Sequence, residues 1–147
     1  MSSTFDPATH GWKSLKSKGF FAEVGPLWSR PLDHGWEYGL LVEPRHENGV
    51  GVVHGGMLVT LLDQAVSMIA WAANDQQPCT TIHLDTHFVA PSVAGDFIVA
   101  RGEVVRKTSS LIFLRGTLSV NDKQVMYGQG IMKILHKKQT SQLTVEA

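Results

Sequence analysis

The sequence predicts an α+β domain in which a curled antiparallel sheet surrounds one long buried helix. Two patterns lead to this prediction. Residues 55–74 form an apolar run with a single ionisable side chain, Asp63, and a helix that is apolar on nearly all sides is buried on nearly all sides. Strand-like segments joined by short turns follow it, and such strands are antiparallel neighbours. A sheet can bury the helix only by curling around it.

The elements are expected in the following order. A short helix over 10–18, with Trp12 and Leu15 pointing inward, precedes a stretch interrupted by Gly and Pro. A strand over 36–44 and a glycine-containing loop lead to the long helix. Tightly connected strands are then expected at 81–91, 97–106, 111–120 and 125–135. Four glycines within these strands would permit the curvature of the sheet: Gly102, Gly116, Gly128 and Gly130.

Length and charge balance limit the classes of function. A chain of 147 residues is expected to form one domain, 1–147, with a real hydrophobic core. Thirteen basic and thirteen acidic residues give a formal net charge of zero, which argues against a nucleic-acid partner. The single cysteine, Cys79, excludes an intramolecular disulfide, and the N-terminus has no apolar core of signal-peptide length. A cytoplasmic protein is expected.

Residues 52–73 are nearly long enough to cross a membrane. Asp63, near the middle of the run, would cost about 2.5–3.5 kcal/mol there. Four further polar side chains weaken the case: His54, Thr60, Gln64 and Ser67. A buried helix in a domain without membrane contact is therefore predicted.

Positive charge gathers late in the chain. Residues 101–138 carry eight Lys and Arg side chains against Glu103 and Asp122. A local excess of this kind suits a small polyanion such as a nucleotide phosphate. Ordinary polar strand edges explain it equally well.

Asp63 and the turn before the long helix are candidates for a reaction site. No Lys or Arg lies between residues 46 and 100 to pair with Asp63, and an unpaired buried carboxylate is costly unless it has a task. His54-Gly55-Gly56 opens the helix, where free backbone N–H groups and the positive end of the dipole point outward. That is the geometry of an oxyanion hole, although a sharp turn that needs glycine would also explain these residues.

The spacing of the two features has a geometric consequence. Gly55 and Asp63 are eight residues apart, which is about 12 Å along a helix, so one reacting carbonyl cannot contact both within a single chain. If two such helices lie antiparallel across a twofold axis, Gly55 of one faces Asp63 of the other. Function at these residues therefore implies a dimer with shared sites.

A family resemblance is carried by residues 48–96. The pattern Asn48-Gly49-x-Gly51-x-x-His54-Gly55-Gly56, then Asp63, then Thr81-x-x-Leu84-x-x-x-Phe88-x-x-Pro91 with Gly95-Asp96 resembles the hotdog-fold acyl-CoA thioesterases, and within them the PaaI-like group of the phenylacetate pathway. The resemblance covers roughly residues 20–136. It implies a hotdog fold, in which a sheet wraps a central helix, and dimers that commonly pair into homotetramers.

The resemblance also implies roles for individual residues. Asp63 would be the general base or the nucleophile, and the backbone N–H of Gly55 would polarise the thioester carbonyl. Asn48 and His54 would shape the pocket at the helix start, and Thr81 would help to place the attacking water from the partner-facing strand. The substrate would be an acyl-CoA of unspecified acyl group, hydrolysed without a separate cofactor.

The phosphates of CoA are expected to lie against the basic C-terminal strands. The candidates for this contact are Arg106, Lys107 and Lys133. Contacts of this kind are mainly electrostatic and are screened by salt.

Other interpretations of the same residues are weaker. A hydratase or dehydratase on the same fold would use His54 with an acid to add water to an enoyl thioester. A non-catalytic acyl-CoA-binding protein would have no reason to bury Asp63. Three residues, His83, Asp85 and His87, alternate along one strand face, but their spacing is unlike that of zinc ligands and no metal site is expected. Cys79 has no His base placed beside it by any motif.

Overall fold

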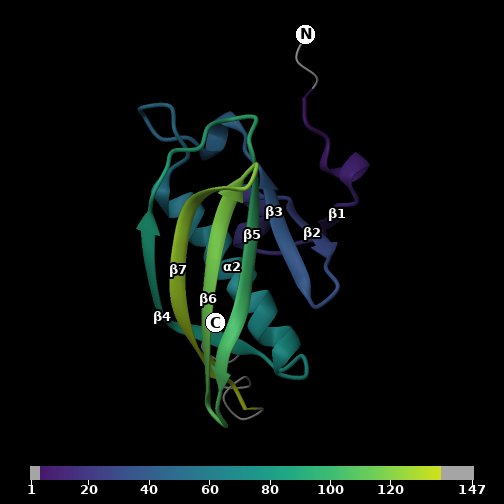
Figure 1. The fold of residues 1–147 in the computed structure, drawn as a ribbon, viewed down its shortest axis with the longest axis vertical. Coiled ribbons are helices and arrows are strands. Elements are labelled where there is room, and N and C mark those ends of the chain that lie inside the picture. The colour runs from purple at the N-terminus through teal and green to yellow at the C-terminus, as the bar shows by residue number, and fades with distance from the viewer. Residues whose placement is uncertain (1–3, 137–147) are drawn as a thin grey trace.

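The computed structural model describes residues 4–136, which form a seven-stranded antiparallel sheet curled around one long helix, α2 (Gly55–Ala73) (Figure 1). The strand order is β1-β2-β3-β5-β6-β7-β4. The helix lies behind the sheet and runs along it, with the strands crossing in front of it (Figure 1). The predicted α+β class and the hotdog arrangement are confirmed.

The predicted long helix and the five strands predicted around it are confirmed, each to within three residues at its ends. Before α2 the chain forms η1 (Pro7–His10), β1 (Lys13–Leu15), α1 (Phe20–Val24), β2 (Leu27–Pro31), β3 (Trp36–Leu41) and η2 (Pro44–His46). After α2 it forms β4 (Cys79–Phe88), β5 (Phe97–Lys107), β6 (Leu111–Val120) and β7 (Lys123–Ile134).

The helix predicted over residues 10–18 is wrong. The 3-10 helix η1 ends at His10, and the φ of 83° at Gly11 directly after it is readily adopted only by glycine. The chain then extends into β1, which pairs with β2, a strand that the sequence did not predict. Trp12 is buried as expected, and Leu15 is half-buried.

The close approach of α2 to the sheet depends on a row of glycines. Gly102, Gly116 and Gly128 are direct cross-strand partners on β5, β6 and β7. A Cβ added at Gly116 would lie 2.8 Å from Leu62 Cδ1 and 3.2 Å from Val66 Cγ1, and a Cβ at Gly128 would lie 3.0 Å from Leu62 Cδ2. The glycines expected to permit curvature therefore also form a seat for the side chains of α2.

One face of α2 is buried and the opposite face is open. Leu61, Leu62, Ala65 and Ala70 have no exposed surface. The other face is half-buried or exposed and carries Thr60, Asp63, Gln64, Ser67, Met68 and Trp71. Burial on nearly all sides is therefore not met within one chain, because the curled sheet covers only one side of the helix.

The apolar character of α2 also meets the criteria for a membrane span. Within residues 4–136, α2 alone has the length and the mean hydropathy, 1.4, of such a span. Its buried side chains belong to the main hydrophobic core and pack against the sheet. This is the arrangement of the central helix of a folded domain.

Gly116→Ala tests the seat of α2. The added Cβ would crowd Leu62 and approach the Arg101 carbonyl oxygen to 3.0 Å, so the helix or the strand must shift. Overpacking of this kind costs about 1–3 kcal/mol, and we expect the free energy of unfolding, measured by urea denaturation, to fall by that amount. Gly49→Ala is the control, because nothing lies within 4 Å of its added Cβ. Equal free energies of unfolding for the two variants would contradict the close packing of α2 on Gly116.

Candidate active site

A short hydrogen bond joins Asp63 to Thr81 on the open face of α2. Thr81 Oγ1 donates to Asp63 Oδ1 at 2.6 Å and lies 3.3 Å from Met132 Sδ. Thr81 is part of β4, which pairs with β7 and runs beside the helix. Asp63 is half-buried. The expected burial of Asp63 is therefore only partial within one chain, and the carboxylate has a hydroxyl donor, although no ion pair reaches it within residues 4–136.

The second oxygen of Asp63 remains available. Within residues 4–136, no group donates a hydrogen bond to Asp63 Oδ2. The Thr81 hydroxyl donates its proton in the hydrogen bond to Asp63, but its oxygen keeps lone pairs that can accept a hydrogen bond from a water. The pair can therefore hold a water beside a carboxylate, which suits either proton abstraction or direct attack on an acyl carbon.

The start of α2 presents a free backbone donor. His54 is the N-cap residue, and its Nδ1 accepts a hydrogen bond of 2.9 Å from the Gly56 N–H. The His54 carbonyl accepts from the N–H groups of Met57 and Leu58. Within the described residues, the N–H of Gly55 has no acceptor. It can therefore donate to an acyl oxygen at the positive end of the helix dipole.

Phe88 forms an apolar wall beside this donor. A Cβ added at Gly55 would lie 3.4 Å from two ring carbons of Phe88, and the ring is 54% exposed. The sequence pattern included Phe88 without assigning it a role. Its position at the end of β4 places an aromatic surface where a ligand at the Gly55 N–H would pass.

Asn48 organises the loop that leads to the helix. Its Oδ1 accepts from the N–H groups of Val50 at 3.0 Å and Val52 at 3.3 Å, which is an Asx-type turn. Gly51 lies within this turn, with a φ of 84°. The Asn48 side chain thus shapes the loop by binding backbone N–H groups of the loop.

His46 anchors the same loop, and the sequence analysis missed it. The side chain is buried, and its Nδ1 accepts from the Glu43 N–H at 2.9 Å. Nε2 therefore carries the proton and donates to the Val24 carbonyl at 2.6 Å. The backbone carbonyl of His46 accepts from the His54 N–H at 2.8 Å. The sequence predicted only a glycine-containing loop at this point, and the burial of His46 depends on contacts that the fold creates.

The basic candidates lie at the opposite end of α2 from Gly55. Lys107 Nζ donates to the carbonyl of Ala73, the last helical residue, at 3.3 Å, where a cation complements the helix dipole. Arg106 precedes it on β5 and points to the other face of the sheet. Lys133 is exposed on β7. The three side chains do not converge, and residues 137–138 of the basic stretch lie outside the described residues.

The polar face of β4 is accounted for by pairwise contacts. His83 Nε2 lies 3.6 Å from Asp85 Oδ2, and His87 stacks on Tyr127 with ring centroids 4.8 Å apart. In the described part of the chain, no group of three His, Cys, Asp or Glu side chains could hold a metal ion.

Cys79 has the environment of a structural thiol. Burial raises the pKa of the Cys79 thiol, and this outweighs the opposite effects of the Asn74 side chain and of Lys107. A raised pKa leaves little thiolate at neutral pH, and the thiolate is the nucleophile. The raised pKa therefore argues against Cys79 as a nucleophile.

Comparison with known sequences identifies the family. The sequence profile described as the Thioesterase superfamily matches residues 50–127, more than half of the chain. The chain belongs to the thioesterase superfamily. The matched range contains Gly55, Asp63, Thr81 and Phe88 and begins two residues after Asn48.

The predicted resemblance to the PaaI-like group is confirmed by similar proteins of known name. Human acyl-coenzyme A thioesterase 13 is 26% identical over 89 residues, 60% of this chain and 64% of the relative, which is less than two thirds of that relative's length. A mutant of the phenylacetic acid degradation protein PaaI from Thermus thermophilus is 26% identical over 79% of this chain and 98% of its own, with a TM-score of 0.69. A Bacillus halodurans protein solved with CoA is 28% identical over 70% of this chain and 69% of its own, with a TM-score of 0.65.

Replacement of His46 tests the anchoring of the loop. His46→Phe keeps a ring but leaves the Glu43 N–H and the Val24 carbonyl without their partner, and each buried group left unpaired costs about 1–3 kcal/mol. We expect reduced stability and faster amide exchange at His54. His46→Asn, which can still accept from the Glu43 N–H, should lose less. Unchanged exchange at His54 in His46→Phe would show that the loop is held in another way.

Proposed function

We propose that this thioesterase-superfamily chain hydrolyses an acyl-CoA thioester to a carboxylic acid and CoA. The observation that carries the proposal is the Asp63–Thr81 pair on the open face of α2, on the same helix as the free N–H of Gly55. The human relative is named an acyl-coenzyme A thioesterase, and the B. halodurans structure was solved with CoA. Both support CoA thioesters as the substrate class.

The chemistry follows from the available atoms. In one route Asp63 takes a proton from a water that attacks the carbonyl, the C–S bond breaks, and the departing CoA thiolate takes up that proton. In the other route Asp63 attacks the carbonyl itself and displaces CoA as the thiolate, and water then hydrolyses the acyl-enzyme anhydride to the acid and the free carboxylate. Thr81 holds one oxygen of Asp63 and leaves the other free to act. The Gly55 N–H would stabilise the oxyanion, and one well-aimed backbone donor is worth about 10²–10³ in rate.

A dimer completes this site. Two antiparallel helices that cross near Val59 would place Gly55 of one chain opposite the partner's Asp63, since both residues are four positions from Val59. The open face of α2 provides the surface for such a crossing. Beside it, β4 is the edge strand of the sheet, with Ile82 54% exposed, and an exposed apolar edge strand favours pairing with another strand. Pairing of dimers into a homotetramer is implied by the family resemblance.

The basic residues would bind the phosphate end of CoA. Ala73, which Lys107 contacts, is ten residues from Asp63, or about 15 Å along α2. An extended CoA arm could cover that distance between a thioester at Asp63 and phosphates near Lys107. Arg106 faces the other side of the sheet from Lys107, and Lys133 lies on β7. These two side chains would therefore attract the phosphates only at longer range.

The hydratase alternative has less support. His54 Nδ1 is engaged as the N-cap acceptor, and within the described residues no carboxylate bonds its ring. A non-catalytic acyl-CoA-binding protein differs from a thioesterase only in turnover, so turnover is the deciding measurement.

Asp63→Asn tests the proposed function. The substitution keeps the shape and the acceptor for Thr81 but removes basicity and nucleophilicity. We expect kcat to fall by about 10² or more, as for the loss of a positioned base, with KM little changed. Free thiol release should be measured with aromatic, short, medium and long acyl-CoAs. Ser67→Ala, one turn along the same open face, is the matched control and should stay near wild type.

Two outcomes would contradict this assignment. If wild-type protein released no thiol from any acyl-CoA, the hydrolase proposal would fail. If Asp63→Asn turned over normally but unfolded at a lower temperature, Asp63 would be a structural residue.

A further inference from the structure

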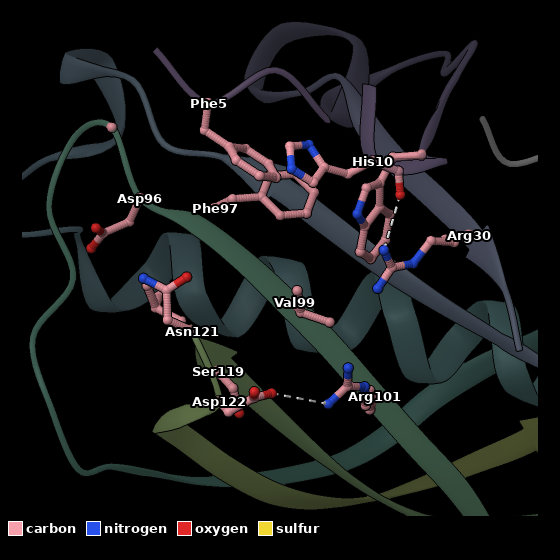
Figure 2. Close-up of a pocket in the computed structure, with 13 residues that line it drawn as sticks. Phe5, His10, Arg30, Asp96, Phe97, Val99, Arg101, Ser119, Asn121 and Asp122 are labelled. Carbon is pink, nitrogen blue, oxygen red and sulfur yellow. Dashed lines mark hydrogen bonds and ion pairs between the residues drawn. The ribbon is translucent and has the colours of Figure 1, made fainter. Parts of the chain in front are cut away.

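A cavity of about 310 Å³ lies on the face of the sheet that points away from α2 (Figure 2). It is lined by the start of β5, by the end of β6 and by the segment that contains Phe5, His10 and Trp12. Val99 and Arg101 alternate along β5 with Ile98 and Ala100, which are buried in the core, so they point to the opposite face. The N-terminal wall lies outside the region that matches the superfamily.

One side of the cavity is an aromatic wall. The Phe97 ring lies 5.1 Å from the Phe5 ring and 4.9 Å from the Trp12 ring, centroid to centroid. Trp12 is 3% exposed, so the wall is held by packing. Val99 and Val120 extend the apolar lining, and Figure 2 shows Val99 between Phe97 and Arg101.

A buried carboxylate orients two arginines at the other side. Glu37 has no exposed surface, and it accepts from Arg30 Nε and from Arg101 Nε, each at 2.7 Å. Arg30 also donates to the His10 carbonyl at 3.0 Å and stacks 4.5 Å from the centroid of Trp12. Charge-assisted bonds from a planar guanidinium fix its direction as well as its place.

Arg101 pairs with Asp122 only through a long ion contact and keeps Nη hydrogen-bond donors that no acceptor in residues 4–136 occupies. Glu37 uses its Nε, and Asp122 Oδ1 lies 4.0 Å from its Nη1, which is beyond a hydrogen bond. The Asp122 side chain is 95% exposed and solvated. Asp96, the other carboxylate of the lining, already accepts from Ser92 Oγ and from a backbone N–H, each at 2.9 Å.

We propose that this cavity binds a small monocarboxylate with an aromatic or branched apolar body. The carboxylate would accept from the Nη groups of Arg101, and the body would lie against Phe97, Val99 and Val120. The volume falls at the lower end of the range for small-molecule sites, which combine apolar walls with a few oriented polar groups. This site lies across the sheet from Asp63 and does not depend on the proposed hydrolase activity.

The test is a titration of the full chain with benzoate, benzamide and inorganic phosphate, followed by NMR signals of the Trp12 indole and of the Asn121 amide. Benzoate should give saturable shifts. Benzamide, which lacks the carboxylate, and phosphate, which lacks the aromatic body, should each bind at least about 10-fold more weakly. Arg101→Gln should weaken benzoate by a similar factor. Arg115→Gln is the control, since Arg115 lies on the same sheet face but pairs with Glu103 at 3.1 Å.

A second variant separates binding from stability. Arg101→Gln removes one partner of the buried Glu37 and is expected to destabilise the fold, whereas Ser119→Phe fills the cavity and leaves both arginines in place. Folded Ser119→Phe should lose the benzoate shifts. The proposal is overturned if benzoate causes no saturable shift, if benzamide binds equally well, or if the shifts persist in folded Ser119→Phe.

Discussion

The close contact between α2 and the glycine row of β5, β6 and β7 is the interaction on which the rest of the structure depends. Because Gly102, Gly116 and Gly128 carry no side chains, Leu62 and Val66 can sit directly on the strands. The sheet then curls around that side of the helix and leaves the other side open. Asp63 lies on the open side because it follows Leu62 directly, about 100° further around the helix.

The same contact determines how a reaction site can form. It places the middle of α2 beside β4, so that the Thr81 hydroxyl reaches Asp63, and it leaves β4 as the sheet edge. The donor at Gly55 and the carboxylate at Asp63 then lie on one rigid helix, about 12 Å apart. A rigid helix cannot bring its own two positions together, so the proposed use of both groups on one acyl carbon requires a second copy across the open face.

The sequence predicted those parts whose signals are local. The apolar run of α2 and the alternating patterns of the later strands fixed their type, and Asp63 and Gly55 stood out against that background. No local signal indicates the Asp63–Thr81 bond or the burial of His46, because both arise from contacts between segments far apart in the chain. Thr81 was placed in the site only by the family resemblance, and His46 was missed. The helix prediction over residues 10–18 failed because the conformation there is decided by the pairing of β1 with β2. A strand of three residues is too short to show an alternating pattern in the sequence.

Mixing two inactive variants tests the shared site most directly. Gly55→Pro removes the N–H at the first helical position, where proline is well tolerated, and His54, with a ψ of 131°, already has the extended conformation that proline requires before it. Asp63→Asn removes the carboxylate. Each variant alone should be nearly inactive, but in mixed dimers one of the two sites combines an intact Gly55 with an intact Asp63. The shared-site account predicts recovery of about a quarter of wild-type turnover after subunit exchange in an equal mixture. A mixture that stays as inactive as its components would contradict it.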